Sequence, residues 1–255
     1  MSDVSEWWST SIIEMEPGSI SLRGMPIENL IGNKSFVEMI WIMTTGDQIN
    51  EKKSALLEAA LVAAVDHGPQ APSIAAARMS ATCGVDINNS LATGINVLGD
   101  IHGGAGQQAL ELYVEIKKEG IENIDNVLKK HKDMNGGFIP GFGHRFHKPT
   151  DPRAPRLIEL VNAAADQGEV SGAFSKIACE IEERLSNKKP VPMNIDGATA
   201  VIYAELGCPP PLARGLFCIS RSVGILAHTW EQMQKDERIK GPTPPSYGWK
   251  YKGNE

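Results

Sequence analysis

A cationic stretch, GFGHRFHKPTDPR, stands at residues 141–153 of the chain. It contains two histidines, two arginines and a lysine, and its glycine and proline residues should prevent a regular helix or strand. The 255-residue chain as a whole has a formal net charge of −6, so this concentration of cations is a local feature. Because long loops inside compact domains are more often functional than accidental, this stretch is a candidate site.

Three histidines lie at separate glycine-marked breaks: His67 before Gly-Pro, His102 before Gly-Gly, and His144 in the cationic stretch. Glycine lets backbone amides and ligands approach closely, and a helix that begins after such a break offers free N–H groups to an anion. The alternative is that each ring only bonds a nearby carbonyl, and this is the stronger expectation for the others: His131, His147 and His228. The histidines at the breaks are therefore candidate site residues.

Two charged residues lie where elements of regular structure are expected. Asp196 follows a proline-rich segment at the start of a helix, where it either caps that helix or acts beside the histidines as a proton donor or acceptor. Arg221 lies within the apolar pattern of the last helix, where a buried guanidinium needs an anion. That anion is either a structural carboxylate or the carboxylate of a ligand, which a guanidinium can bind in two places.

Several common kinds of site are absent from the sequence. There is no GxGxxG dinucleotide motif, no GxxxxGK[ST] phosphate-binding loop, and no histidine pair at HxxxH spacing, so we expect no metal site. The four cysteines lie far apart, which predicts reduced and mostly buried thiols rather than disulfides. The acidic balance argues against broad nucleic-acid binding. With no signal-peptide pattern and no run of roughly 18 apolar residues, we expect a cytoplasmic protein without a membrane partner.

The hydrophobic pattern is mainly helical. The same helical spacing of apolar residues predicts helices in several segments: 52–66, 104–118, 157–164, 174–185, and from Leu212 to Trp230. In the last of these we expect a long buried stripe: Leu212, Leu216, Ile219, Val223, Ala227 and Trp230. Long alternating stretches of β-branched residues are absent, and aromatic residues make up only 6% of the chain. The predicted fold class is therefore mainly α, in one domain or two.

A resemblance extends over nearly the whole chain. Its most specific motifs are IHGGAGQQALEL at 101–112, GFGHRFHKPTDPRAPRL at 141–157 and NIDGATAVIYAELGCPP at 194–210; SLRGMPIENLIGNKSFVEMIWIMTTGD at 21–47, AAVDHGP at 63–69 and ISRSVGILAHTWEQ at 219–232 add to them. With these motifs in this order, the chain resembles the citrate synthase superfamily, and most of all its short citryl-CoA lyase branch. The resemblance implies a citrate synthase-like fold with two helical domains. A large domain comprises 1–103 and 197–255, and a small one, 104–196, carries the loop on the coenzyme A side.

The resemblance also implies catalytic roles. His102 would hold the thioester oxygen of an acyl-CoA, and His144 would bind the hydroxyl or keto oxygen at the bond being broken. In cleavage, His144 would help to draw the proton from the hydroxyl. Asp196 would exchange the proton at the acyl α-carbon. An enolate formed at a thioester needs a hydrogen-bond donor at its oxygen and a carboxyl group that moves the proton, and these residues supply both.

Binding roles follow from the same resemblance. Arg153 and Arg221 would hold substrate carboxylates with help from His67, and Arg238 is a loose match to an arginine that the family takes from the partner subunit. Arg145 and Lys148 would lie near coenzyme A, where Lys148 meets a phosphate. We expect a coenzyme A thioester as a substrate, no covalently bound cofactor, and a homodimer or higher homo-oligomer. The apolar stripe of the last helix supports the dimer, although burial within one subunit is its alternative.

Three functions are consistent with these residues. The first is cleavage of citryl-CoA, or a related 3-hydroxy-acyl-CoA, to acetyl-CoA and oxaloacetate. The second is citrate synthase-like condensation of acetyl-CoA with an oxo acid such as oxaloacetate. The short length favours cleavage, whereas His102 favours a synthase-like enolate site. The third is a non-catalytic helical subunit that binds ligands, against which the complete set of candidate residues argues.

Overall fold

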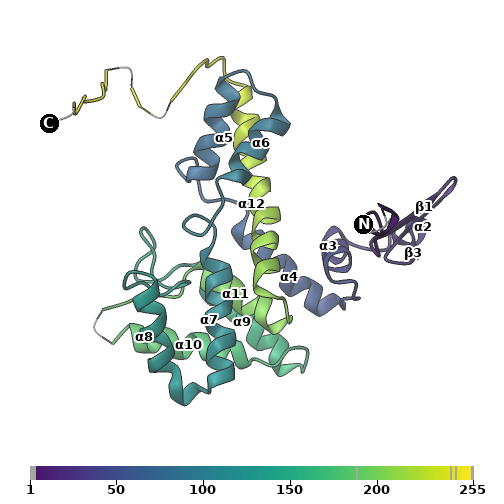
Figure 1. The fold of residues 1–255 in the computed structure, drawn as a ribbon. Coiled ribbons are helices and arrows are strands. Elements are labelled where there is room, and N and C mark those ends of the chain that lie inside the picture. The colour runs from purple at the N-terminus through teal and green to yellow at the C-terminus, as the bar shows by residue number, and fades with distance from the viewer. Residues whose placement is uncertain (1–3, 188, 242, 245, 254–255) are drawn as a thin grey trace. The chain divides into compact units, whose positions relative to one another are not determined.

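The computed structural model describes residues 4–187, 189–241, 243–244 and 246–253, and it confirms the mainly α class. In these residues, twelve α-helices accompany one three-stranded sheet and one 3₁₀ helix (Figure 1). The chain divides into two compact units, Met1–Glu58 and Ala59–Glu255. The domain boundaries expected from the resemblance, near residues 103 and 196, stay a prediction.

The first unit contains a small antiparallel sheet. After α1 (Val4–Trp7), the strands are β1 (Ile13–Glu16), β2 (Ser19–Leu22) and β3 (Met25–Pro26), in the order β1-β2-β3. Ile13 pairs with Leu22 and Glu16 with Ser19, and Gly18 has the positive φ, 84°, that this tight turn requires. The strands are too short for an alternating pattern to reveal them, and none was predicted from the sequence.

Local signals in the sequence define the helices of the first unit, which are α2 (Ile27–Leu30), α3 (Phe36–Thr45) and the start of α4 (Glu51–Ala64). Ser35 Oγ accepts the backbone N–H of Glu38, and the Glu38 carboxylate accepts that of Ser35. This reciprocal pair is a capping box, and Gly46 ends α3 in the left-handed conformation. Arg23 then donates to the Met43 carbonyl at 2.8 Å, which ties the sheet to the end of α3.

The second unit contains the remaining helices: α5 (Pro72–Thr82), α6 (Ile87–Asn96), α7 (Ala105–Glu119), η1 (Ile121–Asn123), α8 (Ile124–Met134), α9 (Arg153–Asp166), α10 (Ala173–Leu185), α11 (Ile195–Glu205) and α12 (Pro210–Met233). Helices α5, α6 and α12 pack against one another, and α11 packs against α7, α9 and α10 (Figure 1). Helix α12 also packs against α7, so it joins the two groups. The helices predicted from hydrophobic spacing are confirmed.

Helix α11 is enclosed by its neighbours, and only Asp196 and Glu205 along it are not fully buried. Its first turn lies against the loop that leads to His144. A Cβ added to Gly197 would overlap the carbonyl oxygen of Gly141, and a Cβ added to Gly141 would lie 2.8 Å from the Gly197 Cα. Two residues without side chains therefore let this loop and the start of α11 meet backbone to backbone.

Replacing Gly197 by alanine should destabilise the protein by about 1–3 kcal/mol, because the new methyl group has no room beside the Gly141 carbonyl. Gly106, in the first turn of α7, is a matched control. A Cβ there would meet its nearest atom, Asp196 Oδ1, at an ordinary 3.7 Å, so Gly106→Ala should leave the stability unchanged or slightly higher. Denaturant unfolding of both variants tests this, and equal stabilities would contradict the close approach.

The stripe predicted on α12 is wrong for most of its length. Leu216 is fully buried, but further along, the predicted residues are exposed: Ile219 by 37%, Val223 by 55% and Trp230 by 56%. The inward face carries Leu216 and Ile225 together with small and polar residues, and α12 passes close to the backbone at residues 61–65. There Ser220 donates to the Leu61 carbonyl, and a Cβ on Gly224 would overlap the Val65 carbonyl.

All four cysteines are free thiols, but the expectation that most are buried is wrong. Cys83 and Cys179 are exposed, Cys218 is partly exposed and Cys208 is buried. The two exposed thiols lie at the C-terminal cap of α5 and on the outer side of α10.

None of the helices in the described residues combines the length and the hydrophobicity that crossing a bilayer requires.

Candidate active site

The ring of His102, which precedes α7, is oriented by the start of α5. Its Nε2 accepts the backbone N–H of Ser73 at 3.2 Å and lies 3.0 Å from Ser73 Oγ. Since Nε2 is an acceptor, the neutral ring carries its proton on Nδ1. Burial, and then the charge of Arg221, lowers the pKa of His102 and favours this neutral form. His102 can therefore donate an Nδ1–H bond to a ligand oxygen.

The ring of His144 has the opposite tautomer. Its Nδ1 accepts the backbone N–H groups of Phe146 at 3.0 Å and His147 at 2.9 Å, so the neutral ring carries its proton on Nε2. Burial, and then His147, lowers the pKa of His144. The His67 ring meets it edge-on with 5.5 Å between centroids, and the His147 ring lies at 4.4 Å. Three imidazoles thus share one region, and in its neutral form His144 offers a donor rather than an acceptor.

Asp196 is the second residue of α11, and the alternative that it caps this helix is wrong. The cap is Asn194, whose Oδ1 accepts the N–H of Asp196 at 2.9 Å and that of Gly197 at 3.2 Å. The Asp196 carboxyl group makes no hydrogen bond or ion pair within the described residues. Burial raises the pKa of Asp196, against the lowering effects of Arg221 and Arg153. A carboxyl group without a protein partner and with a raised pKa is suited to proton exchange.

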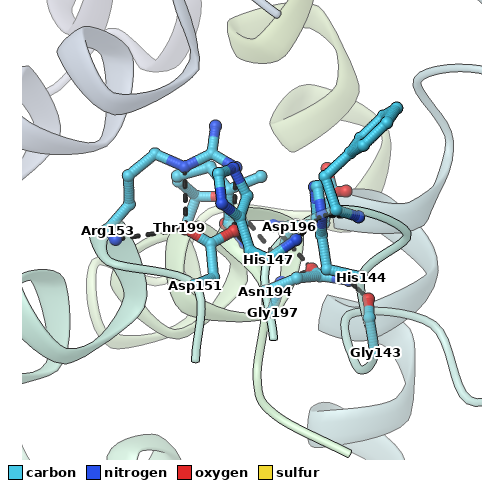
Figure 2. A network of polar contacts seen from close by, with 11 residues as sticks. Gly143, His144, His147, Asp151, Arg153, Asn194, Asp196, Gly197 and Thr199 are labelled. Carbon is cyan, nitrogen blue, oxygen red and sulfur yellow. Dashed lines mark hydrogen bonds and ion pairs between the residues drawn. The ribbon is translucent and has the colours of Figure 1, made fainter. Parts of the chain in front are cut away.

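Arg153, at the start of α9, is held by a buried carboxylate. Its Nε and Nη2 donate to the two oxygens of Asp151 at 2.9 and 2.8 Å (Figure 2), and Asp151 is fully buried. Burial pushes the pKa of Asp151 up, but the hydrogen bonds from Arg153 outweigh it and lower the pKa. Asp151 also accepts the N–H of Ile195 at 3.3 Å, which places Arg153 next to the start of α11.

Arg221 is buried in α12 without a carboxylate partner in the described residues. It is 4% exposed, its Nε donates to the Ala64 carbonyl at 3.0 Å, and its guanidinium carbon lies 4.9 Å from the centre of the Phe217 ring. Burial lowers the pKa of Arg221, whereas the charge of Asp196 raises it. A buried cation that lacks a protein anion is costly, so this side chain is suited to an anionic ligand.

The structure brings most of the predicted site residues close enough for their charges to shift one another's pKa values. Burial, and then Arg221, Arg153 and His144, lowers the pKa of His67. Arg221 and Arg153 also act on the pKa of Asp196, and Arg221 acts on that of His102, so these residues form one electrostatic neighbourhood. Arg238 lies apart from this neighbourhood. The residues that follow it bond to Thr82, at the opposite end of α5 from Ser73.

A cavity of about 1280 Å³ includes His144 in its lining. Among the described residues, its lining includes five cationic side chains, Lys132, Arg145, Lys148, Arg184 and Lys189, together with apolar residues that include Phe138 and Val191. Its described lining contains no aspartate or glutamate. Both predicted coenzyme A residues, Arg145 and Lys148, lie in this wall, so the cavity suits a large anionic ligand with apolar parts.

Three residues that position the site were not singled out from the sequence: Ser73, Asp151 and Asn194. Ser73 bonds to the ring of His102, Asp151 bonds to Arg153 and to the N–H of Ile195, and Asn194 caps the turn that carries Asp196. Asp151 stands in the DPR motif and Asn194 in the NID motif, so attention to the neighbours of Arg153 and Asp196 could have found them. Nothing in the sequence links Ser73 to a histidine 29 residues away.

Comparison with known proteins shows the family to which the chain is similar. The family model for the citrate synthase C-terminal domain matches residues 41–243. The citrate synthase of Haloferax volcanii is 28% identical over 219 residues, which is 84% of this chain and 55% of that protein. Citrate synthase 2 of Bacillus subtilis is 31% identical over 183 residues, 71% of this chain and 48% of that protein. The chain thus spans about half the length of these curated relatives.

Solved structures are similar over nearly the full chain. The citryl-CoA lyase from Hydrogenobacter thermophilus has a TM-score of 0.85 and 31% identity, covering 97% of this chain and 95% of that one. The ATP citrate lyase from Methanothrix soehngenii, in complex with citrate and coenzyme A, has a TM-score of 0.83 at 20% identity, covering 99% and 45%, which shows a shared fold. Since the family model matches most of the chain, the protein belongs to the citrate synthase family of enzymes.

Proposed function

We propose that the protein cleaves citryl-CoA, or a related 3-hydroxy-acyl-CoA, to acetyl-CoA and oxaloacetate. The observation that carries this proposal is the Asp196 carboxyl group, which has a raised pKa and no described protein partner, together with two imidazoles, His102 and His144, that each offer an N–H in the neutral form. The similarity over nearly the full length of the Hydrogenobacter citryl-CoA lyase chain supports the cleavage direction.

The carbon–carbon bond breaks between the acyl α-carbon and the carbon that bears the hydroxyl. Its electron pair passes to the α-carbon and forms the enolate of acetyl-CoA. The Nδ1–H of His102 donates to the enolate oxygen and stabilises the charge that develops there. Asp196, in its acid form, then protonates the α-carbon, which completes acetyl-CoA.

On the other side of the bond, the hydroxyl oxygen becomes the keto oxygen of oxaloacetate. The resemblance led us to expect that His144 draws away the hydroxyl proton, but in its neutral form its Nδ1 is occupied by two N–H donors and its Nε2 already bears a proton. We therefore assign to His144 a hydrogen bond that stabilises the oxygen as its charge grows. The neutral His67 ring, edge-on to His144, is the candidate acceptor of the proton.

The substrate carboxylates and the coenzyme A moiety fit separate cationic regions. Arg153 and Arg221 would bind the carboxylates, and Arg221 supports this role because no described protein carboxylate pairs with it. The cavity lined by Arg145 and Lys148 would hold coenzyme A, with its phosphates near the cationic side chains. The reaction then needs no further cofactor beyond the thioester itself.

Mass analysis of the products from citryl-CoA tests the proposal. Acetyl-CoA and oxaloacetate should form in equal amounts, with no free coenzyme A. Release of free coenzyme A from acetyl-CoA plus oxaloacetate, at a rate comparable to cleavage, would instead establish condensation. That second candidate is favoured by the donor tautomer of His102 and by the curated relatives named citrate synthase. Binding without turnover across a panel of 3-hydroxy-acyl-CoA thioesters would indicate a non-catalytic subunit.

The proposed roles predict the pH dependence of cleavage. Burial raises the pKa of Asp196 and lowers the pKa values of His67 and His102. Because cleavage uses Asp196 as an acid, kcat/KM should fall as the pH rises through the raised pKa of Asp196. It should also fall in acid, where the rings become protonated below the usual pKa of imidazole. A pH profile of kcat/KM tests both limbs. If the fall at alkaline pH persists in Asp196→Asn, a group other than Asp196 causes it.

We also propose a homodimer, or a higher homo-oligomer, formed through the exposed apolar face of α12. This face carries Ile219, Val223, Leu226, Trp230 and Met233. In such an assembly, Arg238 would reach the site of the partner subunit rather than its own. Light scattering should show at least a dimer at micromolar concentration, and a stable monomer would contradict this assembly.

We propose a cytoplasmic location as well, which the four free thiols support.

A further inference from the structure

The side-chain amide of Asn194 connects the loop of His144 to the start of α11 (Figure 2). Its Oδ1 accepts the N–H groups of Asp196 and Gly197, and its Nδ2 donates to the carbonyl oxygen of Gly143 at 2.7 Å. Two backbone N–H donors on one side and a carbonyl acceptor on the other fix the orientation of this amide. If the amide were flipped, its NH₂ group would face the two N–H donors and its oxygen would face the carbonyl. One buried side chain thus contacts the residue before His144 and the backbone of Asp196.

Backbone hydrogen bonds flank this amide. Asn194 donates its own N–H to the Gly141 carbonyl at 3.0 Å, and Gly143 donates to the Pro192 carbonyl at 2.7 Å. Between them, Phe142 and Met193 form an isolated antiparallel bridge. These bonds hold the two segments side by side, and the amide extends the connection to the N–H of Asp196.

We infer that Asn194 is a positioning residue that sets the separation between His144 and Asp196. The inference rests on the proposed function, in which these two groups act at opposite ends of the breaking bond. A shift of about 1 Å in such a pair can lower a rate by about 100-fold. A side chain that bonds to both segments keeps this separation constant.

Capping alone does not require asparagine at this position. Aspartate and serine accept helical N–H groups about as well as asparagine does, so either could cap α11. Neither can also donate an N–H to the Gly143 carbonyl across the same gap. The donor Nδ2 is thus the part of Asn194 that a cap does not use.

Two substitutions separate positioning from capping. Asn194→Asp keeps a cap but turns a charged acceptor toward the Gly143 carbonyl, and Asn194→Ser keeps a neutral cap that is too short to reach it. We expect kcat for cleavage to fall by about 100-fold in both variants, with KM nearly unchanged. Asn123→Ser is the control. Asn123 Nδ2 donates a hydrogen bond of 2.7 Å to the Glu119 carbonyl, away from the site, so this variant should keep the wild-type kcat.

Hydrogen exchange followed by mass spectrometry provides a readout that does not depend on turnover. In Asn194→Asp, the N–H groups of Phe146 and His147 should exchange faster, whereas those of Asp196 and Gly197 should stay protected. Wild-type kcat in either variant, or unchanged exchange at 146–147, would overturn the inference. If the wild type turns over no thioester but exchange responds as described, the proposed function fails while the positioning of the two side chains stands.

Discussion

Replacing Asp196 by asparagine should lower kcat for citryl-CoA cleavage by about 1,000-fold, with little change in KM. The amide has nearly the shape of the carboxyl group but cannot transfer its proton to the enolate carbon. Because the amide keeps the size and shape of the carboxyl group, substrate binding should change little. Steady-state kinetics with citryl-CoA measures both parameters.

Two controls keep this result interpretable. Asp166→Asn, on the exposed end of α9, should leave kcat unchanged. The stability of Asp196→Asn should equal or exceed that of the wild type at neutral pH. Because burial raises the pKa of Asp196, its favourable contribution to folding is present at low pH and is lost as the pH rises through the raised pKa. Wild-type kcat in folded Asp196→Asn would remove the carboxyl group from the mechanism.

Replacing Arg153 by leucine should lower the free energy of unfolding by about 3–5 kcal/mol and also abolish productive substrate binding. Asp151 is fully buried, and without Arg153 its carboxylate would lose both of its side-chain donors. Arg156→Leu is the matched control one turn further along α9. The pair that Arg156 forms with Glu159 is well exposed, at 64% and 67% of the side chains, so its loss should cost at most about 1 kcal/mol.

The effect of Arg153→Leu should depend on pH. The pKa of Asp151 is lowered in the folded protein, so the pair stabilises the fold above the ordinary pKa of aspartate and loses this effect as the pH falls through the lowered value. The difference between wild type and variant should therefore shrink in acid. Denaturant unfolding at neutral and acidic pH measures it, and a constant difference would exclude the ion pair as its cause.

The helices could be predicted from the sequence because apolar spacing records which residues face a core. The same spacing could not show which of two apolar faces of α12 is covered. Within one chain, the buried face carries Ser220 and Gly224, which meet backbone carbonyls, while Val223 and Trp230 remain exposed. A stripe that serves contact between subunits has the same period as one that serves the core, so periodicity cannot distinguish them.

The candidate site could be predicted only in part. Motifs gave the residues whose chemistry depends on their own type, such as His102 and Asp196. The tautomers and the supporting contacts depend on partners far away in the sequence. Ser73 fixes the His102 proton on Nδ1, and Asn194, rather than Asp196, caps α11. Such pairings follow from tertiary packing, which no local pattern records.

Cleavage of citryl-CoA in heavy water tests the central claim most directly. If Asp196 protonates an enolate formed by bond cleavage, the methyl group of the acetyl-CoA produced should carry a single deuterium, as mass spectrometry or proton NMR can show. The exchange of deuterium into added acetyl-CoA gives the background. Acetyl-CoA that forms without deuterium, or no acetyl-CoA at all from wild-type protein, would contradict the proposed cleavage.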